Sequence, residues 1–390
     1  MNSKKVAPVQ IFAFVVALSV AGCRAHDFPQ FQPNYREYAY VTNGGSGTVS
    51  VYDVVNVRVD RELPVGLNPI SVTASSTRNE IYVVNAGAAS GQGSVAVINA
   101  ENNSVAALIP VHKLPTALAL DAKGDLAYVS NSGSNSVSVI DLKARREIAQ
   151  IGVGEEPASV RIAPDGMTLA VANRVGNSVS IIDTATRKVR AVFEGCPGAS
   201  DVVILPDSSK AFVACSAGNQ VMAILLAHTD NHPDGHTNQT DRLESLLDVG
   251  RGPIQLALKP DGGEIFVSNS LSNSISEIYA NTNDVAGAYI MGAGPVRGLV
   301  SADNSLLYVG NLHSQEVMIY SIDDGKRIGH IHVGDGPSAL AFSTEGHLLF
   351  VVDARSGDVA VVRTASRSLF TMLPAGRNPN AIAVKAFKLQ

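Results

Sequence analysis

The chain has 390 residues, and its 35 acidic residues outnumber its 30 lysines and arginines, which gives a formal net charge of −5. Duplex nucleic acid is bound through concentrated positive charge, so this balance argues against such a partner. The 34 glycines and the absence of tryptophan favour many short strands joined by tight turns.

The N-terminus is typical of an export signal. Lys4 and Lys5 precede an apolar run over residues 11–20, and this run is too short to span a bilayer comfortably. We therefore predict that residues 1–22 are a signal peptide. Their removal takes away two lysines and no acid, so the exported chain is more acidic still.

The end of this segment carries a lipidation motif. Residues 20–23 are Val-Ala-Gly-Cys, which matches a bacterial lipobox and predicts a lipid anchor on Cys23. Arg24 stands where the inner-membrane retention residue Asp is common, so we expect an anchor in the outer membrane or at the cell surface. Residues 23–37 are predicted to be a tether. The alternative is ordinary secretion with an unmodified Cys23.

A short strand phrase returns eight times in the rest of the chain. The phrase is usually an aromatic residue, Val, any residue and Asn, and its copies begin at Tyr40, Tyr82, Tyr128, Ala170, Phe212, Phe266, Tyr308 and Phe350. Successive copies are separated by 42, 46, 42, 42, 54, 42 and 42 residues. Self-similarity at such a period predicts a propeller or a solenoid.

One repeat illustrates the expected unit. Residues 157–196 contain four strand-like segments, at 157–162, 169–173, 178–183 and 188–193, with a Pro-Asp-Gly turn between the first two. Four short antiparallel strands in each unit of about 42 residues form the blade of a β-propeller. The predicted fold class is therefore all-β.

Counting strands predicts the number of blades. First strands follow loops of the form Gly-x-x-Pro, and they begin at Pro69 and end with the one at Pro379. The repeat that contains Tyr40 lacks its own first strand, and residues 379–384 are left over. We predict eight four-stranded blades over residues 38–390, with the C-terminal strand completing the N-terminal blade. Seven blades, the alternative, would leave one repeat unplaced.

These repeats resemble a known family. The Tyr-Val-Thr-Asn phrase at 40–43, the Ser-Val-Ser-Val-Ile-Asp run at 136–141 and the Gly-x-x-Pro loops are similar to the YVTN-repeat β-propellers of surface-layer type and of the periplasm. The resemblance covers about residues 38–385 and implies a propeller in an extracytoplasmic setting. It leaves the activity open, because members resemble binding modules whereas related propellers include lactonases and oxidoreductase subunits with haem d1 or a quinone.

Function is expected where the chain departs from its repeat. The residue two positions after the loop proline is predicted to lie near the mouth of the axial channel, and around the ring it is Ser71, Ala117, Ser159, Asp201, Gln255, Arg297, Ala339 and Ala381. Asp201, Gln255 and Arg297 fall on three successive blades and, with Ser159, form the candidate ligand-binding arc. A structural ion pair between Asp201 and Arg297, with water between them, is the alternative. Neighbouring loops at the same mouth add Glu156, Arg251, Asp335, Arg377 and His313.

The fifth blade, which contains Phe212, carries an insertion of twelve residues. The insertion includes His228, His232 and His236, which are weak candidates for metal ligands. Pro233 and Gly235 favour a loop over a helix, so we predict no tight metal site there. His330 and His332 share a strand face and are interpreted as packing or surface residues.

The same blade has two cysteines at unusual positions. Cys196 replaces the glycine that opens the Gly-x-x-Pro loop, and Cys215 replaces the Asn that ends the second strand. In an oxidising compartment this favours a disulfide. However, hairpin register places Cys196 nearer Asn219, so the bond requires the loop to bend. Two buried free thiols are the alternative.

No motif in the chain predicts catalysis or a cofactor. It has no Gly-x-Ser-x-Gly, His-Glu-x-x-His or Cys-x-x-Cys-His pattern. The first hypothesis is a lipid-anchored, monomeric module that binds a protein, a peptide or a cell-envelope ligand on its Gly-x-x-Pro face. The alternative is a lactonase-like hydrolase at the same mouth, where Asp201, Arg297 and Glu156 would supply part of the site.

Overall fold

The computed structural model describes residues 31–89, 91–227 and 240–389, and it divides the chain into two units, Met1–Gln32 and Pro33–Gln390. The predicted signal peptide, the lipidation site at Cys23 and the candidate ligands His228, His232 and His236 lie outside the described residues. Within them, no helix is long and apolar enough to cross a membrane. The one helix in the described ranges is a single 3-10 turn, η1 (Ser132–Ser134).

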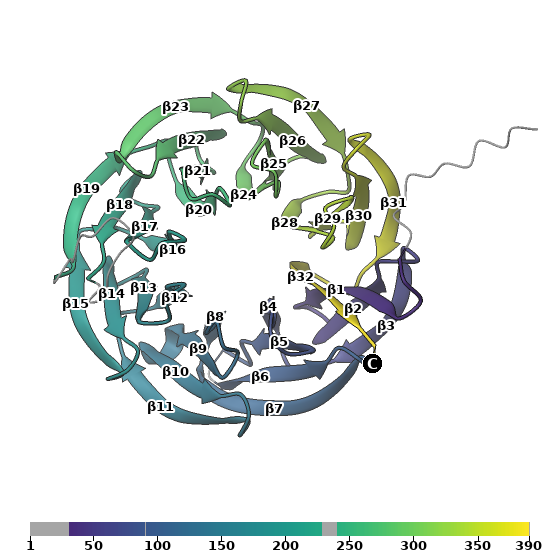
Figure 1. Cartoon of the computed structure of the whole chain (residues 1–390), viewed down its shortest axis with the longest axis horizontal. Helices are drawn as coiled ribbons and strands as arrows, with labels where there is room; N and C mark the ends of the chain where they lie inside the picture. The colour runs from purple at the N-terminus through teal and green to yellow at the C-terminus, as the bar shows by residue number, and fades with distance from the viewer. Residues whose placement is uncertain (1–30, 90, 228–239, 390) are drawn as a thin grey trace, which may run out of the picture. The chain divides into compact units, whose positions relative to one another are not determined.

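From Pro33 onward the chain forms a ring of eight four-stranded antiparallel sheets (Figure 1). From the channel outwards, blade 1 contains β32 (Pro379–Lys388), β1 (Tyr35–Asn43), β2 (Thr48–Asp53) and β3 (Arg58–Pro64). Blade 2 contains β4 (Pro69–Ala74), β5 (Glu80–Asn85), β6 (Gln92–Asn99) and β7 (Ser104–Lys113), and blade 3 contains β8 (Pro115–Leu120), β9 (Leu126–Asn131), β10 (Ser136–Asp141) and β11 (Arg146–Gly152). Blade 4 contains β12 (Pro157–Ile162), β13 (Thr168–Asn173), β14 (Ser178–Asp183) and β15 (Lys188–Glu194).

The second half of the ring repeats this order. Blade 5 contains β16 (Ala199–Ile204), β17 (Lys210–Cys215), β18 (Gln220–Leu225) and β19 (Arg242–Asp248), and blade 6 contains β20 (Pro253–Leu258), β21 (Glu264–Asn269), β22 (Ser274–Tyr279) and β23 (Asp284–Ile290). Blade 7 contains β24 (Pro295–Val300), β25 (Leu306–Asn311), β26 (Glu316–Ser321) and β27 (Lys326–His332). Blade 8 contains β28 (Pro337–Phe342), β29 (Leu348–Asp353), β30 (Asp358–Arg363) and β31 (Ser368–Pro374).

Blade 1 joins the two ends of the propeller. β32 pairs antiparallel with β1 from Tyr35 opposite Lys388 to Asn43 opposite Pro379, which confirms the predicted closure and the eight blades. β1 begins at Tyr35, so the last residues of the segment predicted to be a tether pair with the C-terminal strand. The C-terminal strand thus supplies the innermost strand that the N-terminal repeat lacks, and this closes the ring.

Burial explains why the inner strands are apolar on both faces. Every residue of β13 is buried, whereas the outer strand β15 contains only exposed and half-buried residues. One apolar cluster joins Ala170 and Ile181 of blade 4 to Val202 and Ile224 of blade 5. Each blade therefore buries its two faces against its two neighbours, and the ring needs no separate core.

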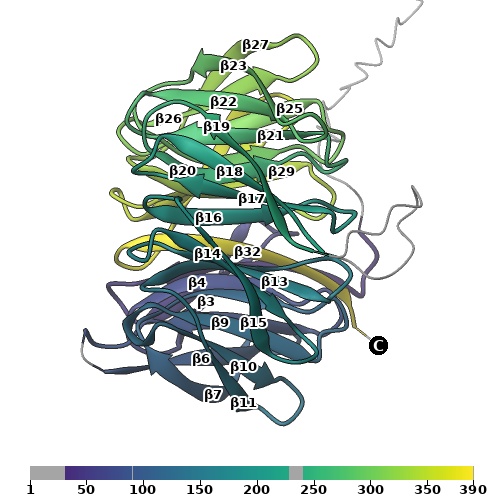
Figure 2. The same ribbon diagram turned by 90° about the vertical axis from the view of Figure 1, so that its left-hand side faces the viewer.

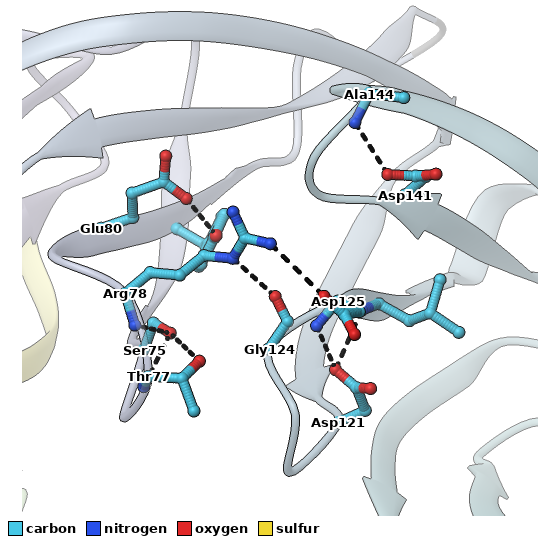
Figure 3. A network of polar contacts seen from close by, with 11 residues as sticks. Ser75, Thr77, Arg78, Glu80, Asp121, Gly124, Asp125, Asp141 and Ala144 are labelled. Atoms are coloured by element: carbon cyan, nitrogen blue, oxygen red, sulfur yellow. Dashed lines mark hydrogen bonds and ion pairs between the residues drawn. The ribbon is translucent and has the colours of Figure 1, made fainter.

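The ring has two faces, which carry different loops (Figure 2). We call the face with the loops from each fourth strand to the next first strand the Gly-x-x-Pro face. On the opposite face, hairpins of adjacent blades bond to each other (Figure 3): Arg78 Nε donates to the carbonyl oxygen of Gly124 at 2.7 Å, and Arg78 Nη2 lies 3.5 Å from Asp125 Oδ1. The blade 5 insertion, between β18 and β19, joins a third strand to a fourth and so leaves from this opposite face.

Candidate functional site

The first strands of all eight blades surround a cavity of about 490 Å3 on the ring axis. Its lining comes from the residues that directly follow the loop prolines, such as Ile70, Thr116, Ala158 and Val296. The cavity therefore lies at the end of the channel next to the Gly-x-x-Pro face. A bound molecule would enter from that face.

A repeated bulge aims the predicted residues at this cavity. In blade 4, Pro157 lies opposite Asn173, but Ser159 lies opposite Ala172, so one residue is unpaired between them. A bulge of this kind re-aims side chains. The shift recurs after the first residue of every innermost strand, and as a result all eight residues two positions after it line the cavity.

Asp201 is held by three neighbours. Ser159 Oγ donates to Asp201 Oδ1 at 3.2 Å, and the backbone N–H of Leu256 donates to Oδ2 at 3.1 Å. Arg161 Nη2 lies 3.8 Å from Oδ1 as the ion-pair partner. Asp201 thus bonds to the blades on both of its sides.

Gln255 continues this chain of contacts to the next blade. Its Oε1 accepts from the backbone N–H of Gly298 at 2.7 Å, and its Nε2 donates to the carbonyl oxygen of Leu256 at 2.8 Å. Because both ends of the amide are bonded to backbone, Gln255 fixes blade 6 against blade 7 and has little capacity left for a ligand.

Arg297 differs from the other members of the arc. Its side chain is half-buried in the cavity, yet the guanidinium has no hydrogen-bond or ion-pair partner among residues 31–89, 91–227 and 240–389. Arg297 makes no direct ion pair with Asp201 within 4 Å, whereas Arg161 does. Burial lowers the pKa of Arg297, while the charge of Asp201 raises it and that of Arg161 lowers it. A half-buried cation without a direct counter-ion favours binding of an anion.

Two of the predicted acids on the rim are engaged in ion pairs outside the cavity. Glu156 lies 3.2 Å from Arg174, and Asp335 lies 3.8 Å from Arg355. Neither lines the channel cavity. These acids belong to the loop surface of the Gly-x-x-Pro face.

The predicted cations of the rim also lie apart from the channel. His313 Nδ1 is 2.8 Å from Arg355 Nη2, and Arg251 Nη2 donates to the carbonyl oxygen of Leu271 at 3.4 Å. Arg377 is exposed and lines a separate cleft of about 540 Å3 between blades 8 and 1. The structure thus brings four of the nine predicted ligand-binding residues into one cavity and places the other five on the surrounding loops.

Arg161 is a cavity residue that the sequence comparison of blades missed. It lies two positions after Ser159 on β12, and side chains two apart on a strand share a face. The equivalent residue is uncharged in the other blades: Thr73, Ala119, Val203, Ala257, Leu299, Ala341 and Ala383. Comparison of this second position around the ring would have identified it.

The two cysteines of blade 5 form a disulfide with a Cα–Cα distance of 4.8 Å. In six other blades a glycine opens the loop and lies against the side chain that ends the second strand; a Cβ added to it would come within 2.6–2.9 Å of that side chain. The glycines are Gly66, Gly154, Gly250, Gly292, Gly334 and Gly376. Cys196 and Cys215 occupy this pair of contacting positions. The loop bend that the disulfide requires is therefore present in those six blades as well, although hairpin register alone did not reveal it.

Comparisons with known proteins identify the fold. No family model and no curated protein matches the chain. Among solved structures, AztD of Citrobacter koseri covers 91% of this chain and 99% of its own at 13% identity, with a TM-score of 0.68. Dihydro-heme d1 dehydrogenase NirN in complex with DHE covers 91% and 76% at 16% identity, with a TM-score of 0.69. A candidate 6-phosphogluconolactonase of Bacteroides uniformis covers 90% and 99% at 14% identity, with a TM-score of 0.60. At these identities the likeness defines a β-propeller and no activity.

Proposed function

We propose that the protein is a lipid-anchored, extracytoplasmic binding module whose axial channel takes an anionic group of its ligand. The ligand is a protein, a peptide or a cell-envelope component that approaches the Gly-x-x-Pro face. Arg297 is the residue that binds this anionic group. The observation that carries this proposal is its half-buried guanidinium, which has no partner among the described residues of the cavity.

The charge of the cavity supports an anion rather than a cation. Its described lining contains two guanidinium groups, Arg161 and Arg297, and one carboxylate, Asp201. Because that carboxylate already accepts hydrogen bonds from Ser159 and Leu256 and forms an ion pair with Arg161, its charge is largely committed to the wall. A planar guanidinium recognises a carboxylate through two parallel hydrogen bonds, so a carboxylate is the favoured group.

Calorimetric titration of the purified full chain with a panel of carboxylates tests the proposal. The panel contains an acidic peptide, a uronic-acid oligosaccharide and a peptidoglycan stem peptide, each beside its neutral amide. We expect at least one carboxylate to bind and its amide to bind weakly. Arg297→Gln should weaken the affinity at least about tenfold, which corresponds to about 1.4 kcal/mol.

Arg251→Gln is the matched control, because Arg251 is an exposed arginine on the same face outside the cavity. It should leave the affinity unchanged. Equal binding by the Arg297→Gln variant, or binding lost with Arg251 instead, would place the ligand elsewhere. Failure of every carboxylate to bind would also count against the proposal.

A lactonase-like hydrolase at the same mouth is the second candidate, and one solved structure of similar fold carries a lactonase assignment. Hydrolysis needs a group that activates water. Asp201 is the single acid in the described lining, which contains no histidine, and both of its oxygens already accept hydrogen bonds. Turnover of a lactone panel that is abolished in Asp201→Asn would favour this candidate over simple binding.

The anchor is tested separately from the ligand. We expect Cys23→Ser to release the protein from the membrane fraction, because the lipid is proposed to be attached to that sulfur. A variant that stays in the membrane fraction with no loss of acyl mass would contradict the lipoprotein assignment.

A further inference from the structure

Blade 7 brings two histidines and a glutamate together on its outer edge. Glu316 on β26 lies directly opposite His332 on β27, and His330 lies opposite Met318, so that His330 and His332 share one face of the outermost strand. The two imidazole rings stand edge to face, with 5.1 Å between their centroids. Figure 1 shows β27 at the perimeter of the ring, with β26 directly inside it.

The three side chains converge on one point. Glu316 Oε1 lies 3.9 Å from His330 Nε2 and 3.8 Å from His332 Nδ1, and one ligand atom from each residue lies within 4.8 Å of the others. These distances are too long for hydrogen bonds. Two ligand atoms on a tetrahedral ion, each about 2.0–2.1 Å from it, are roughly 3.4 Å apart. Small rotations of the side chains would therefore close the group around an ion.

The exposure of these three side chains leaves room for that movement. The side chains of His330, His332 and Glu316 are 49%, 75% and 33% exposed. Neither histidine has a hydrogen-bond partner among the described residues, and Glu316 is the one ion-pair partner of both. His112 and Glu147 provide a contrast on the outer strands of blades 2 and 3, because they make one direct contact at 3.2 Å and bring no third ligand. The blade 7 group thus has the donor number of a metal site, whereas the His112 pair does not.

We propose that Glu316, His330 and His332 bind a divalent first-row transition ion, with Zn2+ as the representative. Such ions bind imidazole and carboxylate ligands together, whereas Ca2+ and Mg2+ prefer sites made of oxygen ligands alone. Three protein ligands leave a coordination position for water or for a group of another molecule. The site lies on the perimeter, so it is independent of the channel and of the function proposed for it.

Zinc titration of the full chain without a polyhistidine tag tests the site. The parent for these measurements carries His228→Ala, His232→Ala and His236→Ala, which removes the other histidine cluster as a source of binding. We expect one equivalent of Zn2+ with a dissociation constant on the order of micromolar. His330→Ala and His332→Ala should each weaken the affinity at least about tenfold, and Glu316→Gln should weaken it as well.

Two further measurements separate ligation from misfolding. Co2+ bound to the parent should give visible ligand-field bands that are absent in His330→Ala, while the far-ultraviolet circular dichroism of both proteins stays the same. His112→Ala is the matched control and should leave zinc affinity unchanged. Stoichiometry and affinity unchanged in a His330→Ala/His332→Ala double variant, or no zinc bound to the parent, would overturn the proposal.

Discussion

The two halves of the channel wall differ although they are built from the same repeat. Blades 8, 1, 2 and 3 present Ala339, Ala381, Ser71 and Ala117 to the cavity, whereas blades 4–7 present Ser159, Asp201, Gln255 and Arg297. In the first half, the small side chains leave space. In the second half, polar side chains bond one blade to the next and fill part of that space.

This difference separates structural from functional departures. Ser159, Asp201 and Gln255 all have partners within the wall, so their polarity is accounted for by contacts between blades. Arg297 is the member of the arc without one. A polar residue at an unusual repeat position is therefore a weak indicator of function until its hydrogen bonds are known.

Removal of Asp201 should have the largest effect on stability. Asp201→Ala leaves the N–H of Leu256 and the hydroxyl of Ser159 without their acceptor, and it leaves two guanidinium groups in the cavity without the carboxylate. We expect the free energy of unfolding to fall by about 3–4 kcal/mol. Chemical denaturation followed by circular dichroism measures this change.

The small half of the wall provides the control for that experiment. Ala339→Ser adds a hydroxyl at the equivalent position of blade 8 and should change the free energy of unfolding by less than about 0.5 kcal/mol. Equal losses for Asp201→Ala and Ala339→Ser would show that the two halves do not differ energetically in the way described.

The disulfide allows a similar comparison between blade 5 and its neighbours. It closes a loop with a sequence separation of 19 residues, so Cys196→Ser/Cys215→Ser should lower the free energy of unfolding by about 3 kcal/mol. Cys196→Gly/Cys215→Asn restores the residues of the other blades, and Asn can hydrogen-bond to the loop as Asn85 does to the carbonyl oxygen of Val65. We therefore expect a smaller loss for this variant.

Denaturation of both double variants and of the oxidised parent measures the difference. If glycine and asparagine are no better than two serines at these positions, the contact between loop and strand contributes nothing in blade 5. Reduction of the parent should lower its stability to about that of the serine variant.

Blade 8 has an acid in the contact between the loop and the end of the second strand, and this makes its stability depend on pH. Asp353 is fully buried where most blades have Asn, and burial, with the nearby charge of Asp358, raises its pKa from 3.8 to about 8. The folded protein therefore holds a proton that the unfolded chain releases above pH 3.8. Because the unfolded chain binds fewer protons than the folded protein over this range, the free energy of unfolding falls as the pH rises from about 4 to about 8. Above pH 8 it falls no further from this cause.

Asp353→Asn should remove this contribution. We expect the variant to be more stable than the parent by about 1–2 kcal/mol at pH 8, and the difference should shrink toward pH 4. Thermal unfolding of both proteins across this range measures the effect. A difference that does not vary with pH would mean that Asp353 is ionised in the folded state.

The fold could be predicted well from the sequence because each repeat carries the same kinds of residues at equivalent positions. Short apolar phrases, turn residues and loop prolines recur at a fixed period, and the surplus strand at Pro379 left a single way to close the ring. The same alignment brought Ser159, Asp201, Gln255 and Arg297 together, since equivalent positions in a propeller must surround one axis.

Features that depend on side-chain direction could not be predicted in this way. Whether Arg161 or Arg297 pairs with Asp201 is decided by side-chain rotamers rather than by position in the repeat. The contact of Glu316 with His332 depends on the pairing of β26 with β27, whose register shifts between Ile319 and Tyr320. Single-sequence patterns do not reveal such a bulge.

A crystal of the full chain grown in sodium bromide tests the central claim most directly, because it requires no knowledge of the natural ligand. We predict an anomalous-scattering peak in the axial cavity beside the guanidinium of Arg297, and we predict its loss in crystals of Arg297→Gln. Bromide peaks at exposed arginines such as Arg377, with none in the cavity, would contradict the assignment of the channel as an anion-binding site.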